Sequence, residues 1–164
     1  MRYLLLGVCL VTAACSQSPS APSSLAHLPL VSGSASAVAG SDLPFKGAFS
    51  AMETVAGPLH NLTSTEGNAT HLGRFTITSS FNVTPPHATG TATWTASNDD
   101  QLSTSTEGTI VIAFPEGTIT ETHTITGGTG RFAGASGTLI VERILNLVSL
   151  ASTATVSGSL TLER

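Results

Sequence analysis

From Leu43 to the end of the chain, apolar and polar residues alternate with a period of two in one segment after another. In Ala88–Ser97, Ala92 and Trp94 share a face with other small residues, while every second position between Thr89 and Thr95 is threonine. This period, combined with many β-branched residues, predicts β-strands. The expected strands are Phe45–Thr54, Thr70–Val83, Ala88–Ser97, Gln101–Glu107, Thr109–Phe114, Thr118–Thr126, Gly137–Leu145 and Thr153–Glu163.

Short turn-like segments separate these strands and leave no room for a helix, which favours antiparallel pairing. They are Ala56–Pro58, Glu66–Asn68, Pro85–Pro86, Asn98–Asp100 and Pro115–Gly117. Each strand has one apolar face and one face of threonine and serine, and no helix covers the apolar face. We therefore expect an all-β fold, an eight-stranded antiparallel barrel that encloses the apolar faces. A two-sheet sandwich satisfies the same pattern and is the alternative. The threonine faces argue against a transmembrane barrel, which needs an apolar outer band.

The stretch Ile119–Arg143 contains two alternating runs on either side of a glycine-dense connection. Glycine supplies the positive φ angles that tight turns and bulges need. The stretch thus predicts a β-hairpin with an elaborate connection. The predicted turn-forming residues are Gly127, Gly128, Gly130, Gly134 and Gly137.

The N-terminal residues predict export. Arg2 precedes an apolar run that ends at Ala14 and is too short to span a bilayer, as in a signal peptide. The small residues before Cys15 resemble the lipobox of bacterial lipoproteins, in which that cysteine is acylated, although Thr12 stands where the pattern prefers leucine. The alternative is an ordinary secretory leader that is cleaved elsewhere.

These features define three expected parts: a signal peptide at 1–14, a lipidated cysteine with a flexible tether rich in serine, alanine and proline at 15–42, and a barrel domain at 43–164. The expected location is the cell envelope, periplasmic or at the cell surface. There, acyl chains on Cys15 would anchor the protein to the lipid bilayer.

The composition limits the classes of partner that the protein could bind. The formal charge is −4 and aromatic residues are few, so the chain lacks the basic surface and stacking platforms typical of nucleic-acid binding. The five histidines show no metal-ligand spacing, and Cys15 would be the only cysteine left after cleavage. We expect no metal site and no cofactor.

Two segments carry a family resemblance: Gly67–Thr76, with the sequence GNATHLGRFT, and Thr126–Gly137, with the sequence TGGTGRFAGASG. Both look like signatures of a group of small exported bacterial proteins of unknown function. The second also resembles the glycine-rich element of the allene oxide cyclase and dirigent barrels. The resemblance covers roughly residues 43–164 and implies an eight-stranded antiparallel barrel. The plant families act on an apolar substrate or radical inside the barrel, but none of their catalytic residues matches this chain position by position.

Glu121 and His123 are the main catalytic candidates. They lie two apart on one predicted strand, so their side chains leave the same face, about 7 Å apart along it. Ile119 and Ile125 flank them, which indicates that this face looks inward. A carboxylate in an apolar interior has a raised pKa and can act as a general acid or base. The preferred interpretation is nevertheless structural: either Glu121 forms a buried ion pair with Arg74 or Arg143, or the strand register turns it outward.

Trp94, Glu121, His123 and Arg74 are the ligand-binding candidates. For His71–Arg74, the preferred interpretation is structural, with polar side chains that tie the start of a strand to a neighbouring loop. Two hypotheses for function follow. The preferred one is a binding or structural module, and the alternative is an isomerase-like enzyme or carrier for a small apolar molecule. A cavity of several hundred Å³ that is lined by Trp94 and phenylalanines and reaches Glu121 would favour the second.

Overall fold

The structure is a computed structural model that describes residues 42–163. Eight strands follow one another: β1 (Asp42–Ala56), β2 (Leu59–Ala69), β3 (Gly73–Thr84), β4 (His87–Ala96), β5 (Gln101–Ala113), β6 (Glu116–Gly128), β7 (Ser136–Asn146) and β8 (Ala151–Thr161). A short 3-10 helix, η1 (Gly130–Phe132), lies between β6 and β7. No helix within residues 42–163 is long and apolar enough to cross a membrane. The predicted signal peptide, Cys15 and nearly all of the tether lie outside the described residues.

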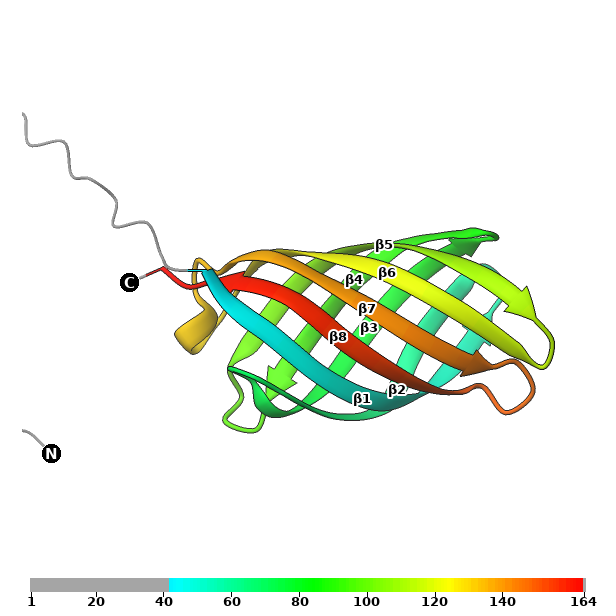
Figure 1. The fold of residues 1–164 in the computed structure, drawn as a ribbon, viewed down its shortest axis with the longest axis horizontal. Helices are drawn as coiled ribbons and strands as arrows, with labels where there is room; N and C mark the ends of the chain where they lie inside the picture. The colour runs from blue at the N-terminus through cyan, green and yellow to red at the C-terminus, as the bar shows by residue number, and fades with distance from the viewer. Residues whose placement is uncertain (1–41, 164) are drawn as a thin grey trace, which may run out of the picture. The chain divides into compact units, whose positions relative to one another are not determined.

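Each strand pairs antiparallel with its neighbours in sequence, and β1 pairs with β8 to close the sheet (Figure 1). The predicted eight-stranded antiparallel barrel is therefore confirmed, and the two-sheet sandwich is excluded for this part of the chain. Closure leaves no sheet edge open to a second chain.

The predicted number of strands is correct only because two errors cancel. Strand β2 was not predicted, because Leu59–Ala69 is polar and lacks a clear alternation; the expected turn at Glu66–Asn68 lies within it. The two strands predicted on either side of Gly108 are one strand, β5. Gly108 pairs with Glu121 on β6, and a Cβ added to it would lie 2.9 Å from Glu121 Cγ. That glycine therefore makes room for the Glu121 side chain and does not end a strand.

The apolar faces of the strands point inward, as predicted, and form one core. Trp94 is fully buried in it, with ring centroids 5.9 Å from Phe49 and 5.2 Å from Phe75. Most threonines on the alternate positions are exposed, among them Thr91 and Thr122. The barrel thus places its hydroxyl-rich face outward, and buries its aromatic residues.

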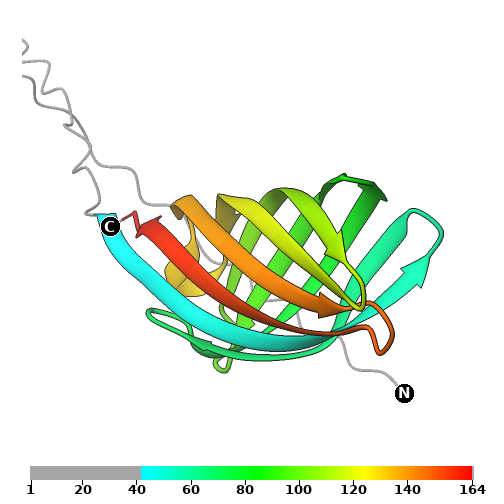
Figure 2. The same cartoon turned by 45° about the vertical axis from the view of Figure 1, so that its right-hand side comes forward.

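The two ends of the barrel differ (Figure 2). At one end, here named the closed end, lie the start of β1, the end of β8 and the connections β2–β3, β4–β5 and β6–β7. Leu72 and Phe132 from these connections are almost fully buried. At the other, the open end, lie the β1–β2, β3–β4, β5–β6 and β7–β8 turns.

The glycine-dense connection adopts the turn conformations that the sequence predicts. Positive φ angles occur at Gly127, Gly130, Gly134 and Gly137. Gly128 serves close packing instead, because a Cβ there would lie 2.1 Å from the Gln101 carbonyl oxygen and 2.7 Å from Phe132 Cβ. The connection thereby buries Phe132 in the hydrophobic core.

The two signature segments meet at the closed end. Arg131 Nη2 donates a hydrogen bond to the Leu72 carbonyl oxygen at 3.3 Å, and Arg131 Nε lies 3.5 Å from Asp100 Oδ2. His71 Nε2 lies 3.2 Å from the Pro44 carbonyl oxygen, which ties the start of β3 to β1. These contacts favour the structural interpretation of His71–Arg74. They also give the segments Gly67–Thr76 and Thr126–Gly137 one shared role, the closure of this end.

Candidate functional site: a charged cluster below an apolar cavity

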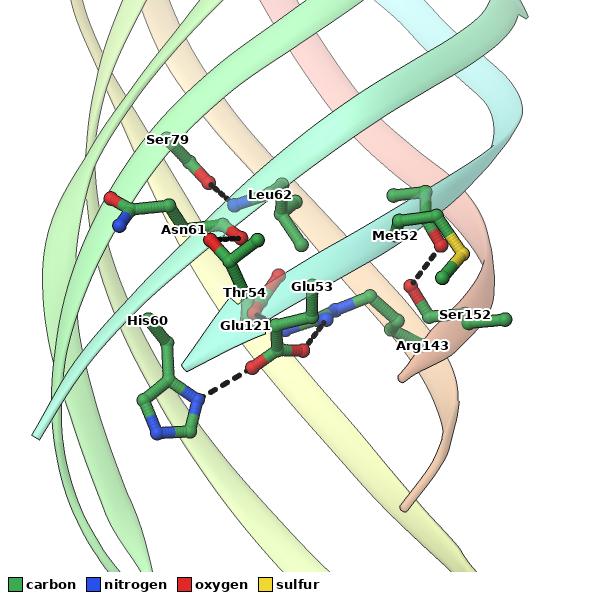
Figure 3. A network of polar contacts seen from close by, with 12 residues as sticks. Met52, Glu53, Thr54, His60, Asn61, Leu62, Ser79, Glu121, Arg143 and Ser152 are labelled. Carbon is green, nitrogen blue, oxygen red and sulfur yellow. Dashed lines mark hydrogen bonds and ion pairs between the residues drawn. The ribbon is translucent and has the colours of Figure 1, made fainter. Parts of the chain in front are cut away.

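Five inward-facing residues form a polar cluster between the aromatic core and the open end. Because inward positions of neighbouring strands lie side by side, residues far apart in the chain come together here. The cluster consists of Glu53 on β1, His60 on β2, Glu121 and His123 on β6, and Arg143 on β7. Figure 3 shows Glu53 between His60 and Arg143, with Glu121 behind it.

Arg143 bridges the two carboxylates of the cluster. Its Nη1 donates to Glu53 Oε2 and its Nη2 donates to Glu121 Oε1, both at 2.8 Å. The three side chains are 3–4% exposed, so both ion pairs are shielded from water. Arg143 Nε is buried and has no hydrogen-bond partner within residues 42–163.

A histidine contacts each carboxylate. His60 Nδ1 lies 2.6 Å from Glu53 Oε1, and the His60 side chain is 21% exposed. His123 Nε2 lies 3.5 Å from Glu121 Oε2, and its Nδ1 is 3.0 Å from the Thr104 hydroxyl. His60 therefore faces the open end, whereas His123 connects the cluster to the aromatic core.

The electrostatics of Glu121 differ from the sequence expectation. Burial by itself raises the pKa of its carboxyl group, as expected. However, the hydrogen bond with His123 and the positive charge of Arg143 outweigh burial, so that the pKa lies below its ordinary value. Desolvation likewise opposes the charge of Arg143, but the two carboxylates raise its pKa above the usual value. The raised pKa that the catalytic interpretation requires is therefore wrong, because the carboxylate is hydrogen-bonded to His123 and has a buried cationic partner, Arg143.

A cavity of about 320 Å³ lies between this cluster and the open end. Its floor includes Glu53, His60, Glu121 and Arg143. Its walls are mostly apolar and come from strands and turns on all sides: Val55, Phe81, Val83, Pro85, Pro86, Ala88, Ile110, Ile112, Ile119, Leu145, Leu147 and Leu150. This volume and this combination of apolar walls with a few polar groups are typical of small-molecule sites.

Exposed apolar side chains continue the cavity walls outward at the open end. Val55 and Ile112 line the cavity and are 48% and 58% exposed. Phe114 in the β5–β6 turn and Val148 in the β7–β8 turn are 77% and 71% exposed. An apolar molecule would thus meet apolar side chains before it reaches the cavity.

The predicted site residues lie in different environments in the structure. Glu121 and His123 point inward and contact each other, and the partner of Glu121 is Arg143, as one structural alternative states. Arg74 is exposed and makes no ion pair with Glu121. Trp94 packs 5.4 Å from the His123 ring but does not line the cavity. Of the predicted ligand-binding candidates, Glu121 alone reaches the cavity.

Sequence reasoning missed Glu53 and His60. Glu53 has the same strand parity as the inward-facing Phe49 and Ala51, so its position carried a usable signal. His60 lies on β2, whose sequence gives no such pattern. Within the described part of the chain, no three His, Cys, Asp or Glu side chains are grouped so as to hold a metal ion.

Comparisons of the chain with models of known protein families, with curated proteins and with solved structures find no match. The geometry of the cavity and of its charged floor therefore carries the functional argument.

Proposed function

We propose that this protein is a binding module that holds a small apolar molecule in the cavity at the open end of its barrel. The observation that carries this proposal is the 320 Å³ cavity, with apolar walls above a buried charged floor. The sequence leaves two functions open, a binding or structural module and an isomerase-like enzyme or carrier. The proposed function takes the binding module from the first and the carrier from the second.

The filled half of the barrel supports this interpretation. Side chains can just fill an eight-stranded barrel, and here Trp94, Phe45 and Phe132 do so toward the closed end with no exposed surface. Protein interiors are otherwise close-packed, and a void loses dispersion contacts. A cavity of this size beside a well-packed core is a cost to stability that ligand binding accounts for and a purely structural role does not.

The alternative is an isomerase-like enzyme that uses Glu121 and His123. Both side chains are buried and in contact, and Glu121 reaches the cavity. However, its lowered pKa keeps Glu121 ionised and weakly basic, and the ion pair with Arg143 holds its oxygen in place. These features suit a fixed polar floor better than proton transfer.

The finer expectations from the sequence are part of this proposal. We propose that the barrel is of the allene oxide cyclase or dirigent type, and that it is exported and anchored to a membrane through Cys15. What supports this is the glycine-rich signature and the lipobox-like leader. The tether would join β1 at the closed end, which leaves the open end opposite the point of attachment.

Binding can be tested with the uncharged fluorophore N-phenylnaphthylamine, whose emission rises in apolar surroundings. We expect saturable binding to the wild-type barrel. Ala88→Phe, which places a ring in the cavity, should abolish it. Thr89→Phe is the matched control, because Thr89 is the exposed neighbour on the same strand, and it should bind as the wild type does. Equal binding by both variants, or none by the wild type, would contradict the proposal.

A further inference from the structure

The floor of the cavity is electrostatically unbalanced. Two carboxylates, Glu53 and Glu121, face one guanidinium, Arg143, so the cluster carries a net charge of −1 when His60 and His123 are neutral. Within residues 42–163, His60 is the one further ionisable side chain on the cavity lining. Both terminal nitrogens of Arg143 are already bonded to the carboxylates.

Unused hydrogen-bonding capacity remains at this floor. An ionised carboxylate offers about four acceptor positions, and Glu53 uses its two oxygens once each, for Arg143 and His60. Arg143 Nε–H has no partner within residues 42–163, but it is fully buried, so a ligand in the cavity cannot reach it. The floor therefore offers spare acceptors beneath apolar walls.

From this arrangement we propose the chemical class of the ligand: an apolar molecule with a hydrogen-bond-donating head group, an alcohol or amine, that points to Glu53 and Glu121. This inference rests on the proposed binding function. The head group donates a hydrogen bond to a carboxylate oxygen of the floor. The tail packs against the aliphatic walls, such as Ile119 and Leu145.

The same floor rejects a carboxylate head group. A fatty acid would bring a third carboxylate next to two buried ones, and the only guanidinium there is already shared. A buried charge that lacks a partner is strongly unfavourable, so a clear preference should appear between molecules with the same tail.

The test is displacement of N-phenylnaphthylamine from the wild-type barrel by octanol, octylamine, octanoate and octane at neutral pH. We expect octanol or octylamine to displace the probe at concentrations at least about tenfold below octanoate and octane, a difference of about 1.4 kcal/mol. Octanoate or octane that competes as well as both donors would overturn the inference.

A matched pair of variants tests whether the carboxylates of the floor cause the preference between head groups. Glu121→Gln removes one carboxylate from the floor and should reduce the discrimination against octanoate. Glu142→Gln, one residue before Arg143 on the exposed face of β7, should leave it unchanged. If Glu121→Gln does not fold, Glu53→Gln serves the same purpose. Equal discrimination in the floor variant and in the control would also overturn the inference.

The two proposals fail in distinguishable ways. If the probe does not bind, or if Ala88→Phe does not block it, the binding function itself is wrong. If the probe binds in the cavity but the head groups compete without the expected order, the binding function stands and the ligand class is wrong.

Discussion

Arg143 is the residue whose loss should affect stability most sharply. Arg143→Met keeps much of the side-chain volume but leaves Glu53 and Glu121 facing each other in the interior without a cation. Removing one partner of a buried ion pair costs about 3–5 kcal/mol, because an uncompensated charge remains. Here two carboxylates lose the same partner, each 2.8 Å from a guanidinium nitrogen. For a domain of this size, the loss corresponds to a melting temperature lower by roughly 9–25 °C.

The pH dependence of stability should weaken as well. In the wild type, the pKa of Glu121 lies below its ordinary, unfolded value, so the unfolded chain binds more protons. The stability contributed by Glu121 is therefore present above the unfolded pKa and is lost as pH falls through the folded pKa. In Arg143→Met, the charge and the hydrogen bond of Arg143 no longer oppose burial, so the pKa of Glu121 rises above its wild-type value. The folded variant then binds more protons than the folded wild type, and its stability gains less as pH rises through the carboxyl range.

The assay is urea unfolding followed by circular dichroism at several pH values, with the unfolding free energy from linear extrapolation. Arg74→Met is the control, because Arg74 is exposed, and it should change stability by no more than about 0.5 kcal/mol. A triple variant, Glu53→Gln, Glu121→Gln and Arg143→Met, should regain much of the lost stability because no charge remains unpaired. An Arg143→Met protein within about 1 kcal/mol of the wild type, or with the wild-type pH slope, would refute this reasoning.

Two further predictions concern other parts of the chain. Gly128→Ala should destabilise the barrel by about 1–3 kcal/mol, since the added Cβ would press on the Gln101 carbonyl oxygen. Thr124→Ala, on the exposed face of β6, is the control. Equal urea midpoints for the two variants would contradict the packing argument. Metabolic labelling with a palmitate analogue should mark the wild type and not Cys15→Ala, and a label that persists in the variant would exclude lipidation at Cys15.

Local patterns in the sequence determined the fold class. Alternation with a period of two fixes which face of a strand is apolar, and the absence of covering helices requires the apolar faces to meet. Thus the burial of Trp94, the inward direction of Glu121 and His123, and the turn at Gly127–Gly137 were predictable. Strand β2 was not, because its polar residues hide its alternation.

The site itself was decided by the tertiary structure. Glu121 was predictable as an inward carboxylate, but the choice of Arg143 over Arg74 depends on the register of β6 and β7, which places Arg143 opposite Ile119, two residues from Glu121. The pairing of Glu53 with Arg143 joins residues 90 positions apart, across a closure between β1 and β8 that no local pattern records. The direction of the Glu121 pKa shift follows from its partners, since burial alone raises the pKa of a carboxyl group, whereas the hydrogen bond with His123 and the charge of Arg143 together lower it. The cavity likewise exists only because the aromatic residues fill one end of the barrel and stop short of the other.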